Sequence, residues 1–232
     1  MTPKAFIFDV FGTIVDWRTG VANEVQKFFS DKNIDFSPLE FADLWRGEYD
    51  PSMKRIRDGN RGYVALDVLH RENLVTVLGA TKLLGHFSEE EISSLNHAWE
   101  KLPGWPDSSS GLHVLKQKAI IAPCSNGSIA IMTRIAKYSD LPWDCILGAE
   151  IARNYKPAKE TYLRSVEAIG LQPEEVVMVA AHNSDLEAAR NYGLQTAFIP
   201  RTMEHGKNQI SDLQPSSDWD YVISEISELA AI

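Results

Sequence analysis

The first residues that could do chemistry lie near the start of the sequence. Residues 5–8 form a short apolar run, which is typical of a buried strand, and Asp9 follows directly. Gly12 then lets the backbone take a tight turn. In an open α/β sheet, ligands bind in the crevice beyond the carboxyl ends of the strands. The sequence therefore predicts a carboxylate that is presented in such a crevice.

Three later segments place polar side chains after a predicted strand or at the start of a predicted helix. Residues 125–127 read Ser-Asn-Gly and lead into a helix, which suits anion binding but is equally explained by capping of that helix. Lys156 precedes a proline at the start of a helix that carries Tyr162, and taken alone it is an ordinary surface lysine. Asp185 lies where another strand turns into a helix. The pattern at each segment is weak by itself.

Composition restricts the classes of protein to consider. The chain has 232 residues, of which 44% are hydrophobic and 24% charged, and its formal net charge is -9. This acidity argues against a general nucleic-acid surface. No apolar run is long enough to span a membrane, and no secretory signal precedes the first strand. The two cysteines, Cys124 and Cys145, are too few for a disulfide framework or a metal cluster. We therefore expect a cytoplasmic globular protein.

The periodicity of apolar residues predicts an α/β fold. Between residues 34 and 100 the pattern is helical, whereas beyond a segment rich in proline and glycine at 102–107 strands alternate with helices. Such alternation indicates a parallel sheet with right-handed crossovers. The predicted helices of the first block are 39–49, 63–78 and 89–99; the later strands are 119–123, 145–147, 176–180 and 196–199, and the later helices are 128–138, 158–169 and 184–192. Residues 201–218 are predicted to form a loop, followed by a final helix from about Tyr221.

Residues 9–13, which read Asp-Val-Phe-Gly-Thr, resemble the first motif of the haloacid dehalogenase superfamily. Ser125, Lys156 and Asp185 match its later motifs in order and spacing, over nearly the whole chain. The resemblance implies a Rossmann-like parallel sheet core, formed by residues 1–14 and 100–232, with a helical cap inserted at 15–99.

The resemblance also implies roles for these residues. Asp9 would be the nucleophile, and Thr13 would orient its loop. Ser125, with Asn126 beside it, would bind the negatively charged part of the substrate. Lys156 would pair with the nucleophile, since a cation within about 4 to 6 Å keeps an aspartate ionised.

Two departures argue against the magnesium-dependent phosphatases of this superfamily. Phe11 stands where they carry the aspartate that protonates the leaving alcohol, and phenylalanine cannot transfer a proton. Ala180 and Ala181 stand where they carry a Gly-Asp pair that helps to hold Mg²⁺. Attack of a carboxylate on a carbon that bears a halogen needs neither an acid nor a metal, because halide leaves as an anion. The resemblance narrows accordingly to the L-2-haloacid dehalogenases, with no metal and no cofactor expected.

That narrower family receives the halide on an arginine of its cap, in a Leu-Trp-Arg context that Arg46 matches here. Without the resemblance, Arg46 would be an ordinary helix-surface residue with a salt bridge. Phe11 and Trp45 are expected to wall the pocket, although aromatic residues of a helical cap are more often plain core. Tyr162 lies at the family's interval after the lysine and is expected to support the site through its hydroxyl.

A third departure lies at residues 180–182, which read Ala-Ala-His where better-known dehalogenases carry Ser-Ser-Asn. The loss of two hydroxyls leaves open how the hydrolytic water is held. We hypothesise that Asp185 orients or activates this water, and that His182 acts as a base or hydrogen-bonds the departing halide. The larger imidazole would also favour small substrates such as haloacetates, fluoroacetate included.

The predicted function is metal-independent hydrolysis of short L-2-haloacids to 2-hydroxyacids through an aspartyl ester. A magnesium-dependent small-molecule phosphatase is one alternative, and a non-catalytic relative that binds a small carboxylate is another. The expected partner is a halogenated carboxylate, with neither nucleic acid nor membrane. Family members are often dimers, so a homodimer is also open.

Overall fold

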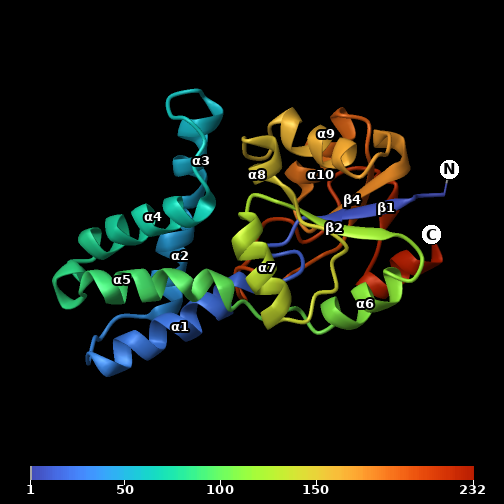
Figure 1. Ribbon diagram of the computed structural model, residues 1–232. Coiled ribbons are helices and arrows are strands. Elements are labelled where there is room, and N and C mark those ends of the chain that lie inside the picture. The colour runs from blue at the N-terminus through green and yellow to red at the C-terminus, as the bar shows by residue number, and fades with distance from the viewer. Residues whose placement is uncertain (1) are drawn as a thin grey trace.

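The computed structural model describes residues 2–232. Within them, the strands form a parallel six-stranded sheet in the order β3-β2-β1-β4-β5-β6 (Figure 1). Strand β1 (Ala5–Phe8) lies in the middle, between β2 (Ile120–Ser125) and β4 (Val176–Ala180). Beyond them lie β3 (Leu147–Gly148), β5 (Gln195–Phe198) and β6 (Tyr221–Val222). The predicted α/β fold with a parallel sheet is confirmed.

The register of the central strands determines where the polar residues gather. Phe8, the last residue of β1, pairs with Pro123 of β2 and with Val179 of β4. The chain fills the sheet on one side of β1 and then on the other, so β1 stands beside the point where the strand order reverses. A crevice is expected at the carboxyl ends of the strands there. Asp9 is the first residue beyond β1 and therefore enters it.

Helices cover both faces of the sheet, which explains why every residue of β1 and β4 is buried. In Figure 1, α8, α9 and α10 lie above the sheet, and α6 and α7 lie below it. These helices are α6 (Ser108–Leu115), α7 (Ile129–Tyr138), α8 (Ala149–Ala152), α9 (Lys159–Ala168) and α10 (Asn183–Asn191), with the 3₁₀ turn η3 (Pro173–Glu175) before β4.

The segment between β1 and β2 is helical before α6, as predicted, and Figure 1 shows it gathered to one side of the sheet. Its interior is aromatic: Trp99 packs edge-on against Trp45 with ring centroids 5.6 Å apart and stacks on His70 at 4.2 Å. The division of the chain into a core and a cap at residues 15–99 stays a prediction. The elements of this segment are α1 (Trp17–Asp31), α2 (Pro38–Gly47), α3 (Tyr49–Arg57), α4 (Leu66–Ala80), η1 (Leu84–His86), α5 (Glu89–Asn96) and η2 (His97–Glu100).

The prediction of a final helix from about Tyr221 is wrong. Tyr221 and Val222 form the edge strand β6 beside β5, and a 3₁₀ helix, η4 (Ile226–Ala231), follows. The Asp220 carboxylate accepts hydrogen bonds from the backbone N–H and the hydroxyl of Thr196, at 2.8 and 2.7 Å, which holds this segment against the sheet. Long-range pairing therefore overrides the local helical pattern.

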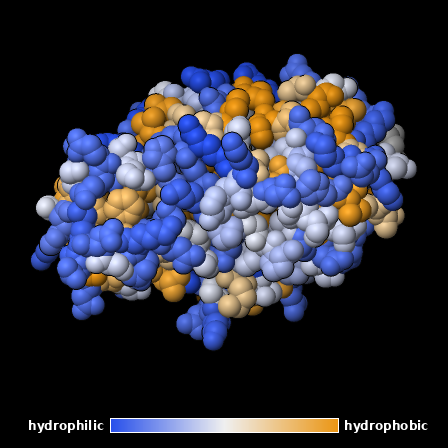
Figure 2. All heavy atoms as spheres, turned by 60° about the horizontal axis from the view of Figure 1, so that its bottom comes forward, coloured by the Kyte–Doolittle hydropathy of each residue, from blue (hydrophilic) through white to orange (hydrophobic). Residues whose placement is uncertain are grey.

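The surface is largely hydrophilic. Figure 2 shows continuous polar colouring over much of one face, with apolar atoms in separate patches. Scattered apolar residues of this kind are normal on a globular protein. Among residues 2–232, no helix has the length and apolar character needed to cross a membrane.

Candidate active site

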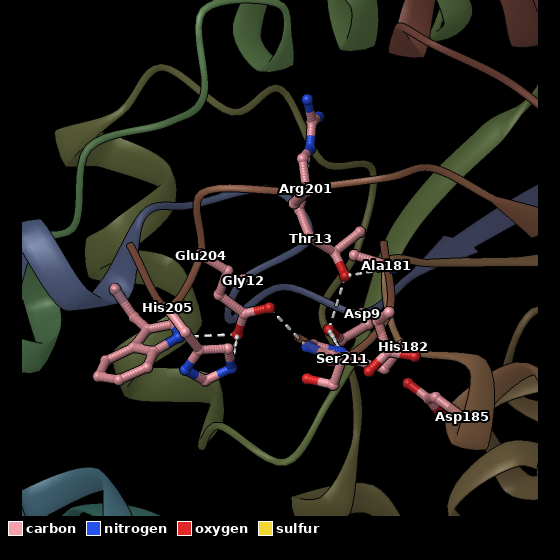
Figure 3. Close-up of polar contacts among 12 residues, drawn as sticks. Asp9, Gly12, Thr13, Ala181, His182, Asp185, Arg201, Glu204, His205 and Ser211 are labelled. Atoms are coloured by element: carbon pink, nitrogen blue, oxygen red, sulfur yellow. Dashed lines mark hydrogen bonds and ion pairs between the residues drawn. The ribbon is translucent and has the colours of Figure 1, made fainter. Parts of the chain in front are cut away.

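The turn after β1 holds the Asp9 side chain in one orientation. Asp9 is only 7% exposed, and its Oδ2 accepts a hydrogen bond from Thr13 Oγ1 at 2.8 Å. Thr13 Oγ1 in turn accepts the backbone N–H of Ala181, which follows β4, at 2.9 Å. The Thr13 hydroxyl therefore ties the β1 turn to the end of β4 (Figure 3). The role of Thr13 in orienting the nucleophile stays a prediction.

Lys156 lies between two carboxylates. Its Nζ donates to Asp9 Oδ1 at 2.8 Å and also to Asp185 Oδ2, although 147 residues separate it from Asp9. Its backbone N–H donates to the Asn126 side-chain oxygen at 2.7 Å, which ties the segment before α9 to the end of β2. The other Asp185 oxygen accepts the Tyr162 hydroxyl. The structure thus brings together five residues from four separate segments of the chain: Asp9, Asn126, Lys156 with Tyr162, and Asp185.

These contacts fix the charges of the cluster. Burial alone would raise the pKa of Asp9, but the charge of Lys156 and the hydrogen bond and charge of His182 hold it far below its ordinary value. Burial would lower the pKa of Lys156, yet the two carboxylates raise it above its ordinary value. Burial and the Asp9 carboxylate raise the pKa of Asp185. Asp9 is therefore ionised at neutral pH, as a nucleophile must be.

Arg46 on α2 is surrounded by aromatic rings. Its guanidinium carbon lies 3.7 Å from the ring centroid of Tyr49, 5.4 Å from that of Trp17 and 5.9 Å from that of Phe11. Nη1 is buried and has no hydrogen-bond partner within residues 2–232. An unpaired buried donor of a cation is costly unless an anion completes it. Arg46 therefore offers a site for a small anion.

Asp9 and Arg46 line the same cavity, whose volume is about 280 Å³. Its lining combines apolar side chains, such as those of Phe11 and Met53, with charged and neutral polar ones. This combination suits a small, partly apolar anion. The lining residues are Asp9, Phe11, Arg46, Tyr49, Asp50, Met53, Asn126, Lys156, Pro157, Tyr162, His182, Ser184 and Asp185.

Three of the residues predicted to bind the substrate do not line this cavity: Thr13, Trp45 and Ser125. Thr13 is fully buried, and its hydroxyl is used within the turn after β1. Trp45, expected as a wall of the pocket, is fully buried in the aromatic interior, and its Nε1 donates to the His70 carbonyl at 2.8 Å. Ser125 is also fully buried, and its hydroxyl accepts the Gly127 backbone N–H at 3.0 Å, so it stabilises the turn after β2. Asn126, beside it, does reach the cavity.

His182 stands between two carboxylates, as Figure 3 shows. Its Nδ1 lies 3.1 Å from Asp9 Oδ2 and its Nε2 lies 2.9 Å from Glu204 Oε2. Burial would lower the pKa of His182, but Asp9 and Glu204 raise it well above its ordinary value. Sequence reasoning missed Glu204, which lies in the polar segment after β5, where neither periodicity nor a motif marks a buried acid. It also missed Tyr49 and Met53.

Comparison with known proteins identifies the family. Residues 3–193 match the family model described as haloacid dehalogenase-like hydrolase. The chain is 25% identical over 203 residues to the (S)-2-haloacid dehalogenase of Xanthobacter autotrophicus, covering 85% of this chain and 75% of that protein. The structure of the defluorinating L-2-haloacid dehalogenase Rha0230 is 45% identical, with a TM-score of 0.96, and covers 99% of this chain and 94% of that chain.

A second solved structure, the L-2-haloacid dehalogenase PA0810, is 38% identical with a TM-score of 0.94, covering 99% of this chain and 97% of that chain. The two structural matches each cover 99% of this chain, whereas the family model ends at residue 193, before β5 and Glu204. With a carboxylate, a lysine and an arginine around one cavity, the chain belongs to the haloacid dehalogenase-like hydrolases, and within them to the L-2-haloacid dehalogenase family.

Proposed function

We propose that this protein hydrolyses short L-2-haloacids to 2-hydroxyacids. One observation carries the proposal: an ionised Asp9 and an unpaired, buried Arg46 donor face a single small cavity with an apolar wall. A carboxylate nucleophile and an anion receiver are the two groups that displacement of a halide requires. The relatives named as (S)-2- and L-2-haloacid dehalogenases support the same reaction.

The first step is a displacement at carbon. An Asp9 oxygen attacks C2 of the substrate, the new C–O bond forms as the carbon–halogen bond breaks, and the halide leaves with the bonding electrons toward Arg46. Phe11 lines the cavity with an apolar ring. A single displacement at a saturated carbon proceeds from the side opposite to the leaving halide, so C2 is inverted. Lys156 and Asn126 are the groups available to the substrate carboxylate. Holding the reactants in line supplies much of the rate.

The second step is hydrolysis of the ester. Water attacks the Asp9 carboxyl carbon, the bond from that carbon to the substrate oxygen breaks, and the 2-hydroxyacid leaves with a proton. Tyr162 and Lys156 occupy both oxygens of Asp185, which fixes its place beside the reacting carboxyl group. His182 Nδ1 also faces Asp9. Asp185 and His182 are therefore the two candidates for the group that handles the water.

Phosphatase chemistry is not favoured. Phe11 is 2% exposed and packs edge-on against Trp99, with ring centroids 5.8 Å apart, so the position that a leaving alcohol's acid would need is apolar. The carboxylates of Asp9 and Asp185 are both engaged by Lys156, which competes with a divalent cation for the same oxygens.

The test is halide release in the presence of EDTA. We expect the enzyme to release halide from chloroacetate and L-2-chloropropionate but not from the D enantiomer, because one face of C2 meets Asp9. Fluoroacetate belongs in the series, since one relative is named defluorinating. A parallel assay with Mg²⁺ and a phosphate ester tests the alternative function, that of a magnesium-dependent phosphatase. Phosphate release together with no halide release would overturn the proposal.

The variant that tests the nucleophile is Asp9→Asn, which keeps the size of the side chain and removes its charge. We expect halide release from freshly purified Asp9→Asn to fall by at least about 10³-fold, as is common when a nucleophile is removed. Substantial release from this variant would contradict the nucleophile assignment. The absence of a metal or cofactor requirement, the cytoplasmic location and a homodimer stay predictions.

A further inference from the structure

Glu204 is a buried acid that the reaction described above does not use. It is 2% exposed, and three side chains from different segments surround its carboxylate. Trp17 Nε1 donates to Oε1 at 2.8 Å, His182 Nε2 lies 2.9 Å from Oε2, and His205 Nε2 lies 3.7 Å from Oε1. A buried carboxylate is costly unless it is paired and hydrogen-bonded. Here it is fully engaged.

The turn after β1 leaves room for this carboxylate. Gly12 has a φ of +88°, and a Cβ atom at this position would lie 2.1 Å from Glu204 Oε1. The Glu204 side chain therefore occupies the space that any other residue at position 12 would fill, as Figure 3 shows. The same turn carries the nucleophile. Glu204, which is distant in sequence, thus packs directly against the turn that carries the nucleophile.

Together, Asp9, His182 and Glu204 form a line of three ionisable groups. Both imidazole nitrogens of His182 are used, Nδ1 by Asp9 and Nε2 by Glu204. An ionised carboxylate can only accept a hydrogen bond, so Nε2 must carry a proton. Whenever His182 is neutral, its lone pair is therefore on Nδ1, directed at Asp9. A carboxylate that fixes a tautomer in this way is the third member of hydrolytic triads.

We propose that Glu204 is a positioning residue for ester hydrolysis, holding His182 so that its Nδ1 takes the proton of the water that attacks the Asp9 ester. The inference rests on the proposed dehalogenase function and decides between its two candidate groups. Asp185 remains the partner of Lys156 and Tyr162, which already occupy both of its oxygens.

The charges follow the reaction. In the resting enzyme the two carboxylates keep His182 protonated, and Glu204 stays ionised: burial would raise the pKa of Glu204, but His182 and Trp17 hold it below its ordinary value. Ester formation removes the charge of Asp9, so the pKa of His182 falls. The imidazolium, whose side chain is 23% exposed, then gives its Nδ1 proton to solvent water. Neutral His182 next accepts one proton from the attacking water. As the intermediate collapses, the bond from the Asp9 carboxyl carbon to the ester oxygen breaks, the departing alkoxide takes the proton of the newly added hydroxyl, and the Asp9 carboxylate is restored.

The other charged groups near His182 act indirectly. On the side of Asp9 lies Lys156, which is shared with Asp185, and on the side of Glu204 lies His205. Within the described residues, the ring nitrogens of His182 pair with Asp9 and Glu204 and not with either of these groups. The group next to His182 whose charge changes during the reaction is therefore Asp9. Loss of the Glu204 charge should accordingly slow ester hydrolysis rather than ester formation.

The experiment separates the two half-reactions in Glu204→Gln, which keeps the shape and removes the charge. We expect a burst of about one halide per chain from chloroacetate at close to the unaltered rate, followed by turnover at least about 10-fold slower. Intact-protein mass should then show the ester adduct accumulating. The pH midpoint for hydrolysis should also shift, because the imidazolium that forms lacks its counter-charge.

The matched control is Asp212→Asn. Asp212 lies in the same segment, has a φ of 54° that asparagine tolerates, and accepts hydrogen bonds from Asn183 rather than from His182. We expect no burst and no adduct in this variant. An equal slowing of both half-reactions in Glu204→Gln, or an unchanged pH midpoint, would overturn the proposal.

A measurement on the unaltered chain covers the case in which Glu204→Gln does not fold. Nitrogen NMR of the labelled His182 ring should show protons on both nitrogens at pH 7. A neutral ring with a bare Nε2 would overturn the inference. Failure of the dehalogenase function itself looks different, since the unaltered enzyme would then release no halide from any of the substrates.

Discussion

At the scale of single residues, Arg46 joins charge and shape in a way that lysine cannot. Three aromatic rings surround its guanidinium, and its buried Nη1 has no hydrogen-bond partner among the described residues. A guanidinium stacks on aromatic faces and is weakly hydrated, whereas an ammonium is a strongly hydrated point charge. The aromatic rings therefore hold the Arg46 guanidinium in place and leave its charge available to a bound anion.

We expect Arg46→Lys to slow the first half-reaction by about 10- to 100-fold, because the lysine ammonium cannot keep the planar geometry at the departing halide. The readout is single-turnover halide release from L-2-chloropropionate. Arg61→Lys is the matched control, since Arg61 forms an exposed pair with Glu72 on the surface. Unchanged release from Arg46→Lys would move the halide receiver elsewhere in the cavity.

The predictability of the site differs from residue to residue. Asp9, Lys156 and Asp185 lie close to predicted strand ends or helix starts, so elementary topology together with the family motifs brings them into one crevice. Trp45 was misplaced, because a motif indicates that an aromatic residue belongs to the cap but not which way its side chain points. Glu204 gave no local signal, since it becomes buried only when a distant segment folds over the β1 turn.

At the scale of elements, the turn after β1 fits two other segments at once. Gly12 adopts a φ that a side chain disfavours, and it makes room for the Glu204 carboxylate. The Thr13 hydroxyl reaches the residue after β4, and the Thr13 carbonyl accepts from Arg201 at 2.9 Å. A small change in this turn therefore affects the nucleophile and its surroundings together.

We expect Gly12→Ala to lower the free energy of unfolding by about 1–3 kcal/mol, from the strained φ and the displaced carboxylate, and to slow ester hydrolysis as Glu204→Gln does. Urea denaturation and adduct mass are the two readouts. Gly79→Ala is the control: Gly79 lies in α4 with no atom within 4 Å of the added Cβ, so this change should stabilise by up to about 1 kcal/mol. Equal effects of the two changes would exclude the steric explanation.

Elements with strong local signals were predicted well. The helix predicted over 89–99 begins as α5 at Glu89, where Ser88 and Glu91 form a capping box. Helix α1 is capped by Asp16, whose side chain accepts a hydrogen bond from the Thr19 backbone N–H at 3.0 Å. The prediction for the last residues was wrong for a physical reason: β6 forms because it pairs with β5, and no local pattern encodes this pairing.

At the scale of the whole molecule, Arg201 connects segments far apart in the sequence. Its guanidinium makes two bonds to the Asp107 carboxylate, at 2.8 and 3.0 Å, just before α6, and its Nε donates to Thr13. The side chain is 9% exposed. Arg201 thereby joins the segment after β5 to the nucleophile turn and to the return from the helical segment.

We expect Arg201→Met to lower the free energy of unfolding by about 1–3 kcal/mol at neutral pH, because it leaves the partly buried Asp107 carboxylate without its charged partner. Burial raises the pKa of Asp107, but Arg201 more than offsets this and lowers it. A lowered pKa stabilises above the unfolded value, and that stability is lost on acidification, so the difference between variant and unaltered chain should shrink below about pH 4. Urea titrations at several pH values measure it.

The control is Arg61→Met, whose exposed pair should contribute less than about 1 kcal/mol. A loss in Arg201→Met no larger than that of Arg61→Met would show that the bidentate contact adds no net stability.

The central place of β1 also has a consequence for biosynthesis. The nucleophile is synthesised before its partners, because its lysine lies 147 residues later and its histidine 173 residues later. Until β2 and β4 emerge from the ribosome, β1 is an apolar segment without neighbours and is prone to wrong associations. Contacts of such long range close slowly. A nascent chain should therefore gain the catalytic arrangement late and all at once, and should depend on chaperones until then.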